Sequence, residues 1–158
     1  MKENLPQRKN LRIKDYNYSQ EGCYFITICT KDRKCILSNV GVDAHIDPKI
    51  ELTQTGKIVK KYIENFNFKS KNIKVNEYII MQNHIHMIIE LNGSMWASTP
   101  TINRIVSTLK ILVTKELKHS IWQRNYYEHI IRNENEYLEI LDYINQNPHK
   151  WLEGDKEP

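Results

Sequence analysis

YIIMQNHIHMIIEL, residues 78–91, is the stretch of sequence that decides the fold of this chain. Most of its residues are β-branched or otherwise apolar, which is typical of a strand in a hydrophobic core. Because successive side chains of a strand point to opposite faces, His84 and His86 share one face. The other face carries only apolar side chains, from Ile85, Met87, Ile89 and Leu91. The pattern therefore predicts a core strand that presents two neighbouring imidazoles, which is half of a metal site.

The segments around this strand predict an α+β domain. Strands are expected over residues 24–30, 74–81, 84–91 and 126–131, and helices over 53–66, 100–117 and from 134 onward. Thr99 is expected to cap the second helix, and residues 38–48 are expected to form a loop. Asn133 begins a capping box for the last helix, and Pro148 is expected to end it. The order predicts a ferredoxin-like fold, an antiparallel sheet of about four or five strands with helices on one face and the histidine strand central.

The composition is that of a soluble globular protein, and the length predicts a single domain over residues 1–158. Of its residues 40% are hydrophobic and 27% are charged. No run approaches the ~18 apolar residues that a membrane span needs, so no membrane association is expected. The N-terminus lacks the apolar segment of a secretory signal, and the three cysteines form no C-x-x-C pair. A cytoplasmic protein with reduced thiols is therefore expected.

Charge is distributed unevenly along the chain. Residues 101–132 contain six Lys or Arg and two Glu, whereas residues 133–158 contain seven acidic and two basic residues. Basic segments fit a polyanion such as DNA, although charge alone favours ordinary solvated faces. The candidate phosphate contacts lie in a basic arm over residues 1–20 and in the later basic stretch; they are Arg8, Lys9, Arg12, Arg104, Lys110, Arg124 and Arg132. The acidic tail over residues 152–158 is expected to be solvated.

The last helix carries the second half of the predicted site. Tyr143 and Asn147 are four residues apart, so both project from one edge of the helix, beside its apolar stripe. If this edge leans over the histidine strand, two imidazoles, an amide and a phenol surround one point. Such a set could hold a divalent cation, and the phenol could attack a phosphodiester. Tyr137 is the strongest rival nucleophile, but its position in the apolar stripe predicts a core role.

At these positions the sequence resembles the single-tyrosine HUH transposases, in particular the REP-associated tyrosine transposases and their insertion-sequence relatives. The HUH motif is two histidines around a hydrophobic residue, here Asn83-His84-Ile85-His86. Further similarity lies in WQRNYYEHIIRN at residues 122–133, DYINQNP at 142–148, and segments 8–12 and 15–30. The resemblance therefore covers nearly the whole chain.

The resemblance implies an enzyme that nicks single-stranded DNA near hairpins with Mg²⁺ or Mn²⁺. It implies that Tyr143 forms a 5′-phosphotyrosine link and leaves a free 3′-hydroxyl, while His84, His86 and Asn147 hold the metal. The family has glutamine in some members at the position of Asn147, and many members have proline where this chain has Gln82. Its members act as monomers or as dimers that exchange the tyrosine helix, so a monomer or a homodimer is expected.

Two other functions fit parts of the pattern. A histidine-triad nucleotide hydrolase would need a third alternating histidine, and this chain has Ile88 there. A catalytically silent DNA- or RNA-binding domain on the same scaffold would not need all four site residues. Nearby side chains are expected to be structural: Trp122 as a core anchor, Tyr126 and Tyr127 in strand packing rather than DNA stacking, and His129 as a strand residue.

Overall fold

The structure is a computed structural model that describes residues 22–92 and 101–156. Its main sheet consists of β1 (Gly22–Cys29), β4 (Ile73–Ile80), β5 (His84–Leu91) and β6 (Tyr127–Ile131). A separate hairpin consists of β2 (Ser38–Val42) and β3 (Pro48–Leu52). The helices are α1 (Gln54–Lys69), α2 (Ile102–Leu117) and α3 (Glu134–Leu152), with a short 3-10 turn η1 (Lys31–Arg33) after β1. Arg8, Lys9, Arg12 and Thr99 lie outside the described residues.

The main sheet is antiparallel, with the strand order β4-β5-β1-β6. Together with α1 and α2, the chain order β1-α1-β4-β5-α2-β6 is that of a ferredoxin-like domain. The predicted α+β class is therefore confirmed, and the histidine strand β5 is interior, between β4 and β1. In this register His84 lies opposite Cys29, and His86 lies opposite Thr27. No helix in the described parts of the chain is long and apolar enough to cross a bilayer.

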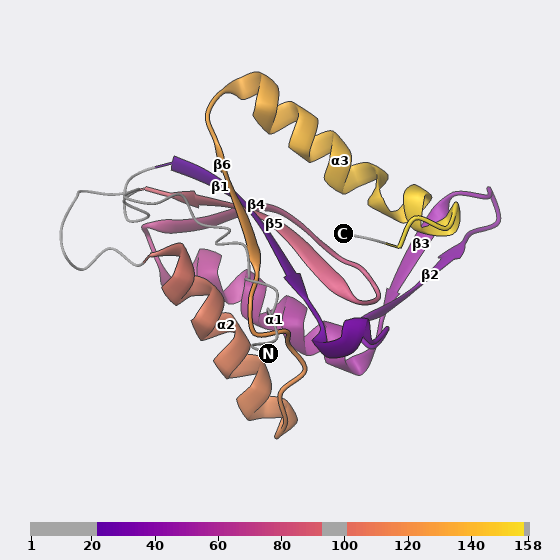
Figure 1. Cartoon of the computed structure of the whole chain (residues 1–158), viewed down its shortest axis with the longest axis horizontal. Coiled ribbons are helices and arrows are strands. Elements are labelled where there is room, and N and C mark those ends of the chain that lie inside the picture. Colours follow the sequence, from indigo (N-terminus) through magenta and orange to yellow (C-terminus); the bar gives the residue numbers. More distant parts are fainter. Residues whose placement is uncertain (1–21, 93–100, 157–158) are drawn as a thin grey trace, which may run out of the picture.

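The helices α1 and α2 cover one face of this sheet (Figure 1). That face is the apolar side of β5 predicted from the alternation, and its side chains are fully buried against both helices. The residues that meet there include Ile85, Met87, Ile89 and Leu91 of β5, Val59 and Ile63 of α1, and Ile105, Leu109 and Val113 of α2. Burial of this continuous apolar surface supplies most of the driving force for folding.

The third helix, α3, lies across the opposite face of the sheet (Figure 1). The expectation that the helices share one face therefore holds for α1 and α2 and is wrong for α3. Its Ile144 packs on Phe25, Ile88 and Ile131, which lie on the same face of the sheet as the histidines. Because this face is partly apolar, leaving it uncovered would expose a hydrophobic patch to water. A helix over the histidine face is also what brings Tyr143 near the histidines.

The C-terminal end of α3 corrects a second expectation, because the helix passes through Pro148 and continues to Leu152. Proline lacks the N–H that would bond to the carbonyl four residues earlier, so it normally ends a helix. Here Ile144, Pro148 and Trp151 are all buried on one side of α3. Their packing offsets the lost hydrogen bond. The start agrees with the prediction, since the side chain of Asn133 accepts a hydrogen bond from the N–H of Glu136 at 2.8 Å.

Two further expectations differ from the structure. Residues 38–48 were expected to form a loop, but they form β2 and the turn into β3. The side chain of Asp43 closes that turn by accepting from the N–H groups of His45 and Asp47, at 2.8 and 3.0 Å. This local chemistry is typical of aspartate in turns. It joins β3 to β2, and β2 is too exposed to give an alternating pattern. The cap of α2 is Thr101, whose hydroxyl accepts from the N–H of Arg104 at 3.2 Å.

Gly56 packs against the end of the segment before β2, and this contact allows a stability prediction. A Cβ at Gly56 would lie 1.9 Å from the carbonyl oxygen of Leu37, which already accepts from the N–H of Thr53 at 3.0 Å. We expect Gly56→Ala to lower the free energy of unfolding by about 1–3 kcal/mol, measured by urea denaturation. Gly41→Ala is the control, because a Cβ there meets nothing within 4 Å. Equal urea midpoints for the two variants would contradict this packing.

Candidate active site

His84 and His86 stand side by side on β5, fully buried beneath α3. The centroids of their rings are 4.6 Å apart. From α3, the Oδ1 atom of Asn147 lies 3.1 Å from Nε2 of His84, and its Nδ2 atom lies 3.4 Å from Nε2 of His86. The structure therefore brings together the three side chains that the sequence predicted as metal ligands.

Each imidazole is oriented by a second contact on its other nitrogen. Nδ1 of His84 lies 2.7 Å from Oδ1 of Asn83, and Nδ1 of His86 lies 2.8 Å from the hydroxyl of Thr27 on β1. An amide oxygen only accepts, so in the tautomer whose Nδ1–H donates to Asn83 the Nε2 atom of His84 keeps a lone pair. Such contacts hold metal-binding histidines in one tautomer. Sequence reasoning missed both orienting residues, although Thr27 faces His86 in the strand register.

Both histidines are neutral at pH 7. Burial lowers the pKa of His84 to about 4. Burial, followed by the neighbouring His84, lowers the pKa of His86 to about 3. A neutral His84 has one N–H for the two oxygens that face it, from Asn83 and Asn147. One of the two contacts therefore brings two lone pairs together. In the tautomer that donates to Asn83 this is the Asn147 contact, and a cation held between these atoms would remove the repulsion.

The donor set of two imidazole nitrogens and one amide oxygen fits a divalent cation. Cis ligands at about 2.1 Å from an octahedral ion lie about 3 Å from each other, close to the separation of Nε2 and Oδ1 here. Imidazole suits softer ions than Mg²⁺, so this set fits Mn²⁺ at least as well. Among the described residues, no three His, Cys, Asp or Glu side chains form a cluster. Among the described residues, the third candidate metal ligand beside the two histidines is therefore the amide oxygen of Asn147.

Tyr143 is half-buried on the same face of α3, one helical turn before Asn147. Its ring centroid lies 5.4 Å from that of His86, and the Nζ atom of Lys150 lies 4.7 Å above its ring. Burial raises the pKa of Tyr143, and the negative charge of Asp155 adds to this. A hydrogen bond with Asn147 acts in the opposite direction and lowers the pKa. The phenol is therefore protonated at neutral pH, and an attack by its oxygen requires stabilisation of the phenolate.

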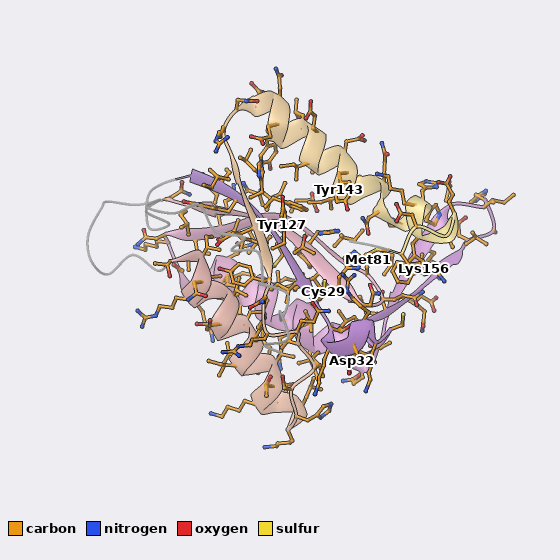
Figure 2. The ribbon with its side chains drawn as sticks, in the orientation of Figure 1. Cys29, Asp32, Met81, Tyr127, Tyr143 and Lys156 are labelled. Atoms are coloured by element: carbon orange, nitrogen blue, oxygen red, sulfur yellow. The ribbon has the colours of Figure 1, made fainter. Side chains whose placement is uncertain are left out.

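A pocket of about 610 Å³ opens this site to the outside. Tyr143 and His86 are both part of its wall, which is completed by side chains of β1, β6, η1 and the first half of α3. Figure 2 labels Cys29, Tyr127 and Tyr143, three wall residues that come from β1, β6 and α3. The side chain of Tyr143 can therefore be reached from outside through this pocket.

The four predicted phosphate contacts that lie in the described residues are not gathered at the site. Arg104 is exposed on α2, which covers the other face of the sheet, and Arg124 and Arg132 are exposed just before and just after β6. Lys110 is half-buried, and its Nζ donates to the carbonyls of Gln123 and Arg124, at 2.8 and 3.3 Å. Burial also lowers the pKa of Lys110. None of these four side chains lines the pocket, whereas Arg33 of η1 does, and no sequence pattern singled out Arg33.

Other side chains near the site depend on the continuation of α3. Lys150 is seven residues after Tyr143, on the same helix face, and the ring of Trp151 lies 6.2 Å from that of His84. Both were missed because the helix was expected to end before Pro148. A helix predicted to continue past Pro148 would have placed both residues near the site.

The expected structural roles are partly confirmed. Trp122 is buried in the core, and Tyr126 and Tyr137 pack against hydrophobic clusters, as predicted. Tyr127 differs, because it is 43% exposed and lines the pocket. His129 lines the pocket as well, where its Nε2 contacts the carboxylate of Glu136.

The buried histidines predict that the metal-free protein loses stability in mild acid. Their pKa values, about 4 and about 3 in the folded protein, lie below the value of about 6.5 in an unfolded chain. As the pH falls below 6.5, the unfolded chain therefore takes up protons first, and the free energy of unfolding decreases. At pH 5 each histidine should remove about 2 kcal/mol. Urea denaturation in EDTA at pH 7.5 and 5.0 measures this difference, and equal values would contradict neutral, buried imidazoles.

Comparison with known proteins shows which proteins this chain is similar to. No protein-family model matches the chain. A Haemophilus influenzae "Uncharacterized protein" is 36% identical over 169 residues, covering 93% of this chain and 91% of that protein. A second protein of this organism, named "Putative REP-associated tyrosine transposase", is 26% identical over 152 residues, covering 85% of this chain and 74% of its own length.

A solved structure, described as a REP-associated tyrosine transposase bound to a REP hairpin, has the same fold. Its TM-score is 0.64 at 22% sequence identity, and the match covers 90% of this chain and 76% of that one. The fold, the sequence similarity over most of the chain and the HUH motif agree. The chain therefore resembles the REP-associated tyrosine transposases in sequence and has the fold of one of them.

Proposed function

We propose that this protein is a metal-dependent single-stranded DNA endonuclease and strand transferase that cuts beside hairpins through a 5′-phosphotyrosine intermediate. The observation that carries the proposal is the contact of Asn147 with both His84 and His86, made from the helix that bears Tyr143. One helix thereby positions a nucleophile and completes a set of metal-binding atoms. The REP hairpin in the solved relative supports hairpin DNA as the substrate class.

In the cleavage step, the phenolic oxygen of Tyr143 attacks the phosphorus of a phosphodiester. The bond from phosphorus to the 3′ oxygen breaks, and this oxygen leaves as a 3′-hydroxyl after it takes up a proton. The 5′ phosphate stays on Tyr143. In the joining step, the 3′-hydroxyl of a DNA strand attacks this phosphotyrosine, which releases the phenol and forms a new phosphodiester.

The side chains around Tyr143 and the histidines have distinct roles in these steps. Lys150 above the ring of Tyr143 and the hydrogen bond from Asn147 both favour the phenolate, against the effect of burial. The neutral His84 and His86 present lone pairs that Asn83 and Thr27 keep in place. A divalent cation bound by His84, His86 and Asn147 would polarise the phosphodiester and offset the charge that develops on it.

The proposal is tested with single strands that carry a hairpin between randomised flanks. Incubation with Mn²⁺ or Mg²⁺ should give a protein–DNA adduct on a denaturing gel, together with a shortened strand that ends in a 3′-hydroxyl. EDTA should abolish both products. Hairpin binding without an adduct in either metal would instead support the alternative, a catalytically silent binding domain on the same scaffold.

A further inference from the structure

We propose that the pocket beside Tyr143 binds one unpaired base next to the scissile phosphate and discriminates against thymine. The inference rests on the proposed function, because it concerns the strand that would reach Tyr143. It adds a specificity site whose residues lie on β6 and on the first half of α3 and are not among the proposed metal ligands.

The position and size of the pocket suit a nucleotide. Its volume of about 610 Å³ is within the range of roughly 300–1,000 Å³ that is common for ligand sites. Because Tyr143 and His86 form part of the wall, a phosphate at the phenol would have its neighbouring nucleotide at the entrance of the same cavity. The cavity wall also contains side chains that can stack on a base or hydrogen-bond to its edge.

The charges of the wall decide which part of the nucleotide enters. Glu136 and Glu139 of α3 line the pocket, and the hydrogen bond from the N–H of Arg132 lowers the pKa of Glu136, which keeps it ionised. Carboxylates repel a phosphate, so the sugar-phosphate backbone is disfavoured on this side. Among the described wall residues, Arg33 is the only Lys or Arg, which suits a phosphate near η1. A neutral base is therefore the part of the nucleotide that fits beside the two carboxylates.

An aromatic surface for this base is present on β6. Tyr127 is 43% exposed, although it lies in a strand of the main sheet. Its ring meets that of the buried Phe25 edge-on, with centroids 6.2 Å apart. The buried Phe25 therefore helps to hold the exposed ring of Tyr127 in place. Exposed aromatic rings that are held in this way are the usual stacking surface for single-stranded nucleic acid.

The carboxylates provide the basis for base discrimination. An ionised carboxylate only accepts hydrogen bonds, so it favours the exocyclic amino groups of adenine, cytosine and guanine. Thymine has no amino group, and its single imide N–H lies between two carbonyl oxygens, so a carboxylate that accepts from this N–H also meets carbonyl lone pairs. Glu136 is already engaged by His129 and by the N–H of Arg132. The exposed Glu139 is therefore the side chain that we expect to read the base.

The first test recovers the strands that become covalently attached from a hairpin library with randomised flanks. At one position next to the cut, the wild-type protein should deplete thymine by about tenfold relative to the input, as expected for one base-edge contact. Glu139→Gln should remove this depletion, because an amide also donates to a carbonyl oxygen. Glu134→Gln, an exposed first-turn position of the same helix outside the pocket wall, makes the same charge change and should keep the wild-type profile. Unchanged depletion in Glu139→Gln would overturn the inference.

The second test measures binding without chemistry, in a Tyr143→Phe background with EDTA. A hairpin strand with 2-aminopurine in its flank should show quenched fluorescence on binding, and Tyr127→Ala should weaken binding by roughly tenfold while Tyr127→Trp keeps it. Equal affinity for Tyr127→Ala and the parent would overturn the inference even if adducts form. If the wild-type protein forms no adduct, the proposed function fails. The aminopurine result then still decides whether the pocket holds a base.

Discussion

Tyr143→Phe should abolish the covalent protein–DNA adduct while leaving the protein folded. The substitution removes one oxygen atom and keeps the ring that packs near His86 and beneath Lys150. The other tyrosine of α3, Tyr137, packs against a hydrophobic cluster and should not replace it as the nucleophile, so we expect a loss on the order of 10³-fold or more in adduct formation. The measurement is the fraction of labelled hairpin strand that is attached to protein on a denaturing gel.

The matched control is Tyr137→Phe on the same helix. Tyr137 packs against the cluster formed by Phe25, Ile88, Ile131 and Ile144, so its hydroxyl has no role in the proposed chemistry. This variant should form the adduct at the wild-type rate, and both variants should keep the helical circular dichroism of the parent. An adduct that persists in Tyr143→Phe and disappears in Tyr137→Phe would exchange the roles of the two tyrosines.

Replacement of His86 by Gln should give the second large effect. It removes one of the two imidazoles that face Asn147, and the remaining donors should bind a divalent cation poorly. Because a bound metal supplies several kcal/mol of charge stabilisation, we expect adduct formation to fall by roughly 10³-fold. Mn²⁺ in large excess should raise the melting temperature of the wild-type protein and leave that of His86→Gln unchanged.

The control for His86→Gln is His119→Gln, an exposed position just after α2. It should retain both the activity and the Mn²⁺-dependent stabilisation. Mixing His86→Gln with Tyr143→Phe adds a test of how the site is completed. Since Asn147 and Tyr143 of α3 face the histidines of their own chain, the mixture should stay inactive. Restored adduct formation in the mixture would mean that the tyrosine helix is exchanged between two chains.

Much of the fold was predictable because it depends on patterns that are local in the sequence. The alternation around His84 and His86 predicted the face of β5 that packs on α1 and α2, and the structure confirms it. The i, i+4 spacing of Tyr143 and Asn147 predicted that both side chains leave one edge of α3. Strand alternation and helix spacing act over a few residues, so they are visible without knowledge of the rest of the chain.

The errors concern features that depend on tertiary contacts. Pro148 has the local properties of a helix end, but the burial of Trp151 three residues later keeps the helix intact. The hairpin of β2 and β3 is largely exposed, and the side chain of Asp43 closes its turn. The same reason explains why Lys150 was missed and why Tyr127 was assigned to packing. Whether a side chain faces a pocket is decided by elements distant in sequence.

The most direct measurement is peptide mass spectrometry of the adduct formed by the wild-type protein with a hairpin strand and Mn²⁺. After digestion with protease and nuclease, we predict a single modified peptide, with a nucleotide joined through its 5′ phosphate to Tyr143. A nucleotide on any other residue, or one joined through its 3′ phosphate, would contradict the proposed nicking centre.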